Sequence, residues 1–129
     1  MLDEPSGAPS PVPRVVATPA ALRAIADVRA EHGPLMFFQS GGCCDGSCPM
    51  CFAVGDFVVG AHDVRLGDVG GCAVYMDLRQ FAAWRHTQLI VDVEPGEAEG
   101  FSLAAGPGRH FVVRSRVFSP EEVATLSPV

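Results

Sequence analysis

The chain has 129 residues, which is enough for one domain with its own apolar core and too few for a multidomain enzyme. Apolar residues make up 48% and charged residues 19%, a composition that excludes an intrinsically disordered protein. The net charge is −6, and the nine basic residues other than histidine are all arginine. The missing lysine excludes Schiff-base and P-loop chemistry, and the acidic balance argues against binding to nucleic acid or to an anionic membrane.

The hydropathy of the chain and its first residues predict a cytoplasmic protein. No stretch approaches the roughly 20 apolar residues that span a bilayer, and residues 1–14 lack the basic and apolar regions of a signal peptide. Residues 1–17 contain four prolines among small and polar neighbours. This composition predicts a disordered tail, followed by a single domain over residues 18–129.

Three segments open the predicted domain. Thr18 and Pro19 are residue types that begin helices, and apolar residues follow at helical spacing until Gly33, so we expect one amphipathic helix. Residues 35–38 are a continuous apolar run of strand length, which predicts a buried strand. Residues 41–55 contain four glycines and no periodicity, which predicts a loop.

Short strands are predicted in the rest of the chain, where apolar residues alternate between glycine-containing turns. Asp77 can cap a short helix, and the sequence from Ser119 to Glu122 has the pattern of a capping box. The predicted fold is mainly β within the α+β class. It is a sandwich of short, mostly antiparallel strands with an N-terminal helix and one or two short peripheral helices. The expected strands cover residues 57–59, 64–66, 72–76, 89–93, 101–104 and 110–118, and the last two are expected to form a hairpin across residues 106–108.

Four cysteines within nine residues are the strongest chemical signal in the chain. Thiolates select zinc, copper or an iron-sulfur cluster over magnesium or calcium, so the cluster predicts a site for one of these. We expect three thiolates and one outside ligand, which is His62, His86 or a cysteine of a partner subunit. His86 is preferred, because it ends a helix and leads into a strand. The expected metal ligands are Cys43, Cys44, Cys48, Cys51 and His86, and the glycines expected to let the loop curl around the ion are Gly41, Gly42 and Gly46.

Two other uses of the same cysteines stay open. One loop thiol could react reversibly with an oxidant or an aldehyde, although Asp45 would disfavour a thiolate, so we expect binding rather than catalysis. The cysteines could also be small buried side chains in a metal-free interaction module. Cys72 lies in an alternating strand and is expected in the core. Asp92 and Glu94 are expected on a solvated strand face.

The chain resembles the bacterial family called domain of unknown function 779 over residues 18–118. The segments that carry the resemblance are HGPLMFFQSGGCCDGSCPMCF, HDVRLGDVGG, WRHTQLIVDVEPGEAEGFSLAAGPG and RHFVVRSRVF. Members of this family are often encoded beside aldehyde dehydrogenases, which implies an accessory role in aldehyde or alcohol oxidation and a dehydrogenase as partner. We also expect a homo-oligomer. In the family the position of Cys48 is commonly serine, which leaves Cys43, Cys44 and Cys51 as the matching thiols.

A second resemblance concerns the fold. The opening helix, the strand that ends in Gly-Gly-Cys and the segment VYMDLRQFAAWRHTQLIVDVEPGEAEGFSL are similar in order and spacing to the A-type iron-sulfur carriers of the HesB-like fold. This resemblance implies a HesB-like β-sandwich with Cys43 in a protruding loop. The carriers have a Cys-Gly-Cys near the C-terminus, where this chain has residues 114–116, Arg-Ser-Arg.

Overall fold

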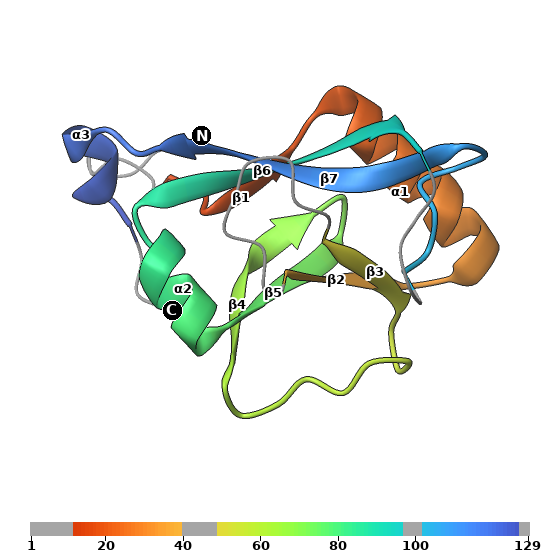
Figure 1. The fold of residues 1–129 in the computed structure, drawn as a ribbon, viewed down its shortest axis with the longest axis horizontal. Coiled ribbons are helices and arrows are strands. Elements are labelled where there is room, and N and C mark those ends of the chain that lie inside the picture. Colours follow the sequence, from red (N-terminus) through yellow and green to blue (C-terminus); the bar gives the residue numbers. More distant parts are fainter. Residues whose placement is uncertain (1–11, 40–48, 97–101, 127–129) are drawn as a thin grey trace, which may run out of the picture.

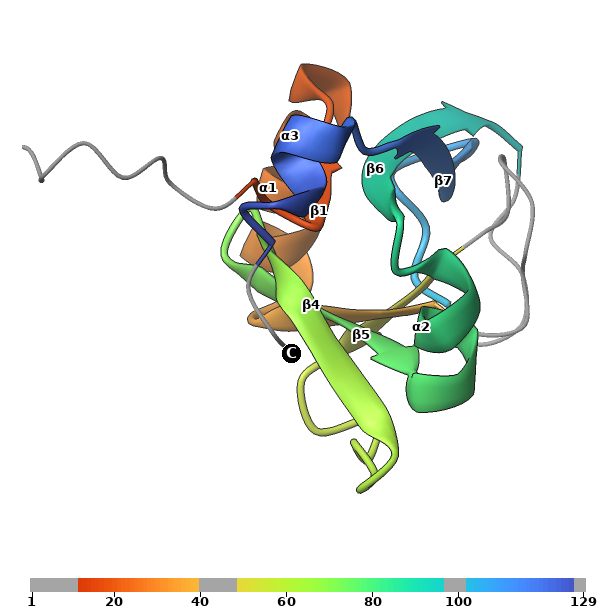
Figure 2. The ribbon, with the colours of Figure 1, turned by 90° about the vertical axis from the view of Figure 1, so that its left-hand side faces the viewer.

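The fold is taken from a computed structural model, which describes residues 12–39, 49–96 and 102–126. Two β-sheets face each other, and α1 and α2 lie on opposite sides of the space between them (Figures 1 and 2). None of the described helices has the length and apolar character needed to cross a membrane. The strands are β1 (Val15–Ala17), β2 (Leu35–Gln39), β3 (Met50–Ala53), β4 (Asp63–Val69), β5 (Cys72–Asp77), β6 (Thr87–Pro95) and β7 (Arg109–Val117), and the helices are α1 (Pro19–His32), α2 (Leu78–Trp84) and α3 (Pro120–Val123).

The sheets are both mixed. Sheet A has the strand order β1-β6-β7, and sheet B has the order β3-β2-β5-β4. The β6–β7, β2–β3 and β4–β5 pairs are antiparallel, whereas β1–β6 and β2–β5 are parallel. The predicted two-sheet α+β fold of mostly antiparallel strands is therefore confirmed. The two parallel pairs join segments far apart in the chain, and local patterns do not reveal such pairs.

Local signals set the helix ends as predicted. The Thr18 side chain accepts a hydrogen bond from the backbone N–H of Ala21, and α1 ends at Gly33, which has a φ of 81° that favours glycine. Asp77 caps α2 through the backbone N–H of Arg79, at 2.9 Å. The β4–β5 hairpin turns at Gly70 and Gly71, whose φ angles of 55° and 81° suit a two-residue turn of type I′.

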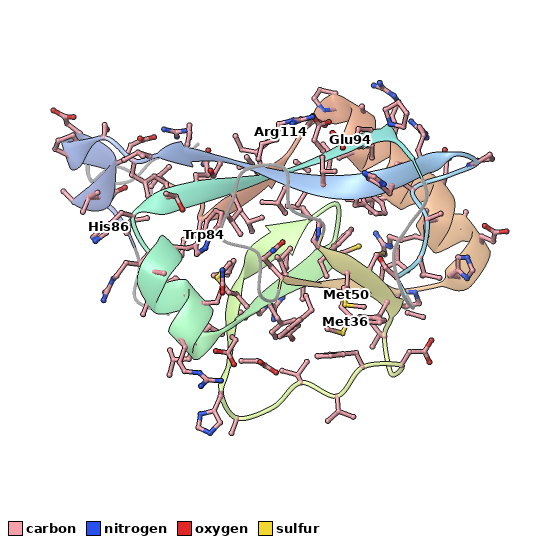
Figure 3. All side chains as sticks on the ribbon, in the orientation of Figure 1. Met36, Met50, Trp84, His86, Glu94 and Arg114 are labelled. Atoms are coloured by element: carbon pink, nitrogen blue, oxygen red, sulfur yellow. The ribbon has the colours of Figure 1, made fainter. Side chains whose placement is uncertain are left out.

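The main core fills the space between the sheets. Phe37 of sheet B and Phe111 of sheet A meet edge to face, with ring centroids 5.0 Å apart. Helix α1 presents its apolar stripe to this core, and Trp84 of α2 points into it from the other side (Figure 3). The largest side chains that are fully buried include Phe37, Phe111, Ile25, Met76, Val74, Val91, Val113, Cys51 and Cys72.

Two strands lie where the sequence predicted a tail and a loop. Residues 15–17, assigned to the tail, form β1, because Val15 is buried opposite Leu89 in a parallel pair. Residues 50–53, assigned to the loop, form β3, which pairs with β2 from Leu35 to Phe38. The glycines and cysteines just before this segment favoured the prediction of a loop. The segment nevertheless has the alternation of a strand, because Cys51 faces the core and Phe52 faces away from it.

Two predicted strands are wrong. Residues 57–59 form no strand. The Phe57 ring instead packs against the rings of Phe38 and Phe52. Residues 102–104 form no hairpin with β7, because β7 pairs along its full length with β6. Residue 101 lies outside the described residues. The segment instead borders β3: Ser102 Oγ accepts from Cys51 N at 2.9 Å, and Leu103 N donates to the Cys51 carbonyl at 2.9 Å.

A smaller apolar cluster lies on the face of sheet B that points away from sheet A, and we call it the outer cluster. Figure 3 shows Met36 and Met50 on this side of the sheet. The Phe57 ring covers it, with its centroid 4.8 Å from that of Phe38 and 5.1 Å from that of Phe52. The segment between β3 and β4 therefore covers an apolar sheet face. The outer cluster consists of Met36, Phe38 and Phe52, with Met50, Phe57 and Tyr75 packed against them.

The predicted capping box opens α3 and ties it to sheet A. Glu122 accepts from Ser119 N at 2.9 Å and forms two hydrogen bonds with Arg116 of β7, at 2.8 and 2.6 Å. The Arg116 guanidinium, followed by the Ser119 amide, lowers the pKa of Glu122 from 4.5 to about 2. This carboxylate therefore stabilises the fold above pH 4.5, and that contribution is lost as the pH falls from 4.5 towards about 2.

We expect Glu122→Gln to lower the melting temperature at neutral pH, and this effect to shrink as the pH falls towards about 2, where Glu122 becomes protonated and loses its charge. Thermal unfolding of the two proteins, followed by circular dichroism from pH 2 to pH 7, measures the difference. Glu121→Gln is the matched control, because Glu121 lies on the same helical turn and forms no ion pair with the described residues. A Glu122→Gln effect that did not vary with pH would contradict the assignment.

Candidate functional site

The cysteine-rich segment connects β2 to β3. Gln39, the last described residue before it, is buried at the end of β2 and lies opposite Met76 of β5. Because β2 and β5 are parallel, the chain leaves both strands at the same edge of sheet B, where β5 continues into α2. Ligands of open sheets often bind at such carboxyl ends of strands. Most of the predicted site residues lie outside the described residues, namely Gly41, Gly42, Gly46, Cys43, Cys44 and Cys48.

A surface hollow of about 380 Å³ lies near this edge, at the beginning of α2. Its described lining residues are His62, Asp77, Leu78 and Arg79. The His62 carbonyl accepts from Leu78 N at 2.7 Å, which fixes the turn before β4 against the start of α2. The backbone N–H of Arg79 lowers the pKa of Asp77, so this carboxylate is ionised and already bound to the helix. The hollow therefore presents one cationic side chain, one imidazole and an exposed leucine.

Cys51, an expected ligand, lies in the main core. Its side chain is fully buried on the inner face of β3, opposite Phe37. Burial, and to a smaller degree the nearby Cys72, raises the pKa of Cys51 to about 12. Metal ligation requires the thiolate, whereas this environment holds the neutral thiol. These observations favour a structural role for Cys51.

Cys72 occupies the core as predicted. It is fully buried at the beginning of β5, and burial raises the pKa of its thiol. Its sulfur lies 3.8 Å from the Gly70 carbonyl, within the hairpin turn. Cys51 and Cys72 are both free thiols. Of the five cysteines in the chain, these two belong to the core of the described structure, and the other three fall within residues 43–48.

The two candidate histidines lie at opposite ends of α2. His62 is exposed beside the first turn of the helix, whereas His86 is exposed just beyond its last turn, at the left edge of Figure 3. The His86 carbonyl accepts from Phe118 N at 2.9 Å, so the backbone at this position is fixed by the end of β7. Within residues 12–39, 49–96 and 102–126, no group of three histidine, cysteine or acidic side chains is placed to hold a metal.

The outer face of sheet A carries a polar network, whereas the sequence predicted only a solvated strand face there. Arg114 of β7 donates to Asp92 at 3.0 Å and to Glu94 at 3.3 Å, and Arg114 and Glu94 lie at the top of the molecule in Figure 3. Thr18 Oγ1 donates to Asp92 at 2.8 Å, and His110 Nε2 lies 3.3 Å from Glu94. The sequence did contain a signal for this network. Carboxylates occupy alternate positions of β6 and face an arginine on β7, which is the pattern of cross-strand ion pairs.

Asp92 is the centre of this network. Burial alone would raise the pKa of Asp92, but hydrogen bonds from Thr18, Arg114 and Val93 outweigh it and hold the pKa below its ordinary value. The carboxylate thus joins the cap of α1 to both long strands of sheet A. Because its oxygens are already engaged by these donors, we assign this network to the fold rather than to catalysis.

Comparison with known proteins gives one family. No curated protein and no solved structure matches the chain, so the HesB-like resemblance stays a prediction. A family model described as domain of unknown function, DUF779, matches residues 24–117, which extend from α1 to the end of β7. The chain therefore belongs to the DUF779 family.

Proposed function

We propose that the protein is a metal-binding protein whose thiolate ligands are Cys43, Cys44 and Cys48. The observation that carries this proposal is the division of the five cysteines. Cys51 and Cys72 are buried in the core, which leaves three cysteines within six residues. These three lie in the connection between β2 and β3, whose two ends are held together by the pairing of Phe38 with Met50. Three thiolates with one outside ligand form a common zinc site, and copper and iron-sulfur clusters also use such donors.

The fourth ligand in this proposal is a histidine. His86 is the preferred candidate from the sequence, and His62 is the alternative, because it lines the hollow near the edge where β2 ends. Neither imidazole takes part in a hydrogen bond or ion pair with the described side chains. Substitution of each histidine by glutamine, with metal affinity as the readout, separates the two candidates.

The test is the metal content of protein prepared without oxygen and without a polyhistidine tag. We expect about one equivalent of metal per chain, measured by elemental analysis together with the visible absorption spectrum and a count of free thiols. The combined Cys43→Ser, Cys44→Ser and Cys48→Ser variant should bind no metal, whereas Cys72→Ala, the matched control from the core, should keep it. The proposal is overturned if the reduced wild-type protein contains no metal and takes up none on reconstitution.

We propose further that the protein assists an aldehyde dehydrogenase. The support is the family assignment together with the association implied by the resemblance, so the partner must be tested directly. We expect the dehydrogenase to co-elute with the wild-type protein and not with the triple cysteine variant. Co-elution that survives loss of the cysteines would indicate a metal-free interaction module. Thiohemiacetal adducts detected on metal-free protein by mass spectrometry would indicate an aldehyde-reactive thiol.

A further inference from the structure

A buried glutamine ends the strand that leads into the cysteine-rich connection. Gln39 is the last residue of β2, and 1% of its surface is exposed. Leu35 and Phe37 point from β2 into the main core, whereas Met36 and Phe38 belong to the outer cluster. Because side chains alternate along a strand, Gln39 points to the same side as Leu35 and Phe37. It is the one polar side chain on the inner face of β2.

An apolar side chain would suit this position of the fold at least as well. Met76 lies opposite Gln39 in β5 and belongs to the main core. A leucine at position 39 would bury a similar surface without the free-energy cost of removing an amide from water. A buried amide also has to be hydrogen-bonded, so a glutamine here indicates a use for its polar groups.

The position of Gln39 connects this amide to the proposed metal ligands. The connection that carries them begins directly after Gln39, and it ends at Pro49, which is buried and directly follows Cys48. The pairing of Phe38 with Met50 holds these two ends together. Three thiolates bring more negative charge than a divalent ion neutralises, and N–H groups that donate to the sulfurs stabilise this excess.

We propose that Gln39 is a positioning residue of the metal site, whose side-chain N–H donates a hydrogen bond to a metal-bound sulfur. This inference rests on the proposed function, because the sulfurs are those of Cys43, Cys44 and Cys48. The donor orients the ligand and stabilises its charge. Its loss therefore weakens metal binding without weakening the metal-free fold.

Gln39→Leu tests this proposal in reduced protein prepared without oxygen. Competition with a chelator measures the affinity for Zn²⁺, and we expect the variant to bind about 10- to 100-fold more weakly than the wild type. With Co²⁺ as the probe, the thiolate-to-metal charge-transfer band should move to lower energy, because a sulfur that accepts no hydrogen bond gives up an electron more readily. Gln39→Glu keeps the shape of the side chain but loses the N–H donor, so it should also bind Zn²⁺ more weakly.

Gln88→Leu is the matched control, because Gln88 is also buried but has a structural role. Its Nε2 donates to the Pro13 carbonyl at 2.9 Å, and its Oε1 accepts from Arg116 at 2.9 Å. Gln88→Leu should lower the melting temperature in EDTA and leave the Zn²⁺ affinity and the Co²⁺ spectrum unchanged. Gln39→Leu should show the opposite pattern.

The outcomes separate this inference from the proposed function. If the wild type binds Zn²⁺ and Co²⁺ but Gln39→Leu has the same affinity and spectrum, this inference is overturned and the proposed function stands. A wild-type chain that binds neither ion overturns both. A Gln39→Leu chain that does not fold in EDTA, as judged by circular dichroism, would assign the amide to the fold and overturn the inference.

Discussion

Replacement of Phe37 by alanine is expected to lower the free energy of unfolding by about 3–5 kcal/mol. The Phe37 side chain is fully buried at the centre of sheet B, and its ring meets Phe111 of sheet A edge to face at 5.0 Å. Alanine removes the whole ring, and the two sheets on either side cannot close the space without breaking their register. Urea denaturation followed by circular dichroism measures the loss. A domain of this size has only about 5–15 kcal/mol in total, so the variant should be near the limit of folding.

The control for this prediction is Val117→Ala. Val117 lies at the exposed end of β7, and its truncation should change the free energy of unfolding by less than about 0.5 kcal/mol. Both residues lie in strands, so a loss of stability that came from weaker strand pairing alone would be similar in Phe37→Ala and Val117→Ala. A loss below about 1 kcal/mol in Phe37→Ala would show that the ring does not join the two sheets.

The helices and most strands could be predicted because their signals are local. Thr18, Pro19 and Gly33 define α1 through capping chemistry and glycine conformation, and Ser119 with Glu122 defines α3 in the same way. These interactions span three or four residues, so the sequence contains both partners within one short window. The alternation of buried residues in β5 is of the same kind.

The missed strands depend on partners far along the chain. Val15 lies in a strand because Leu89 is beside it, and along the chain the two are separated by α1, α2 and all four strands of sheet B. The segment at 57–59 shows the converse, because its strand propensity is high but no described strand lies next to it. Propensity therefore predicts a preference, and the presence of a neighbouring strand decides whether it is realised.

The candidate site could be predicted in part. The density of cysteines directs attention to residues 43–51, where the site stays a prediction, and composition cannot show which thiols face a core. Cys51 was expected among the ligands because it completes a Cys-x-x-Cys spacing with Cys48. The structure places it instead on the inner face of β3, where the short apolar run at residues 50–53 was the sign of a strand. Spacing along the chain becomes informative about ligands only after the strand faces are known.

Cys51→Ser is accordingly expected to lower the free energy of unfolding by about 1–3 kcal/mol, even in EDTA. Serine is close in size to cysteine, but removing its hydroxyl from water costs more free energy than removing a thiol, and its neighbours in the main core are apolar. Cys51→Ala should cost less, because it buries no polar group. Since the pKa of Cys51 is raised to about 12, we also expect its thiol to resist alkylation at pH 8 in the folded protein. Chemical denaturation and mass spectrometry of alkylated protein measure the two effects.

Cys72 provides the matched control for this substitution. It is as fully buried as Cys51, but its sulfur lies 3.8 Å from the Gly70 carbonyl, which can accept a hydrogen bond from a serine hydroxyl. Cys72→Ser should therefore cost less than Cys51→Ser, although both exchange the same atoms. If Cys51 were instead a metal ligand, its serine and alanine variants would lose metal equally and would be as stable as wild type in EDTA. The order of stability in EDTA thus decides whether the fourth loop cysteine belongs to the core or to the metal.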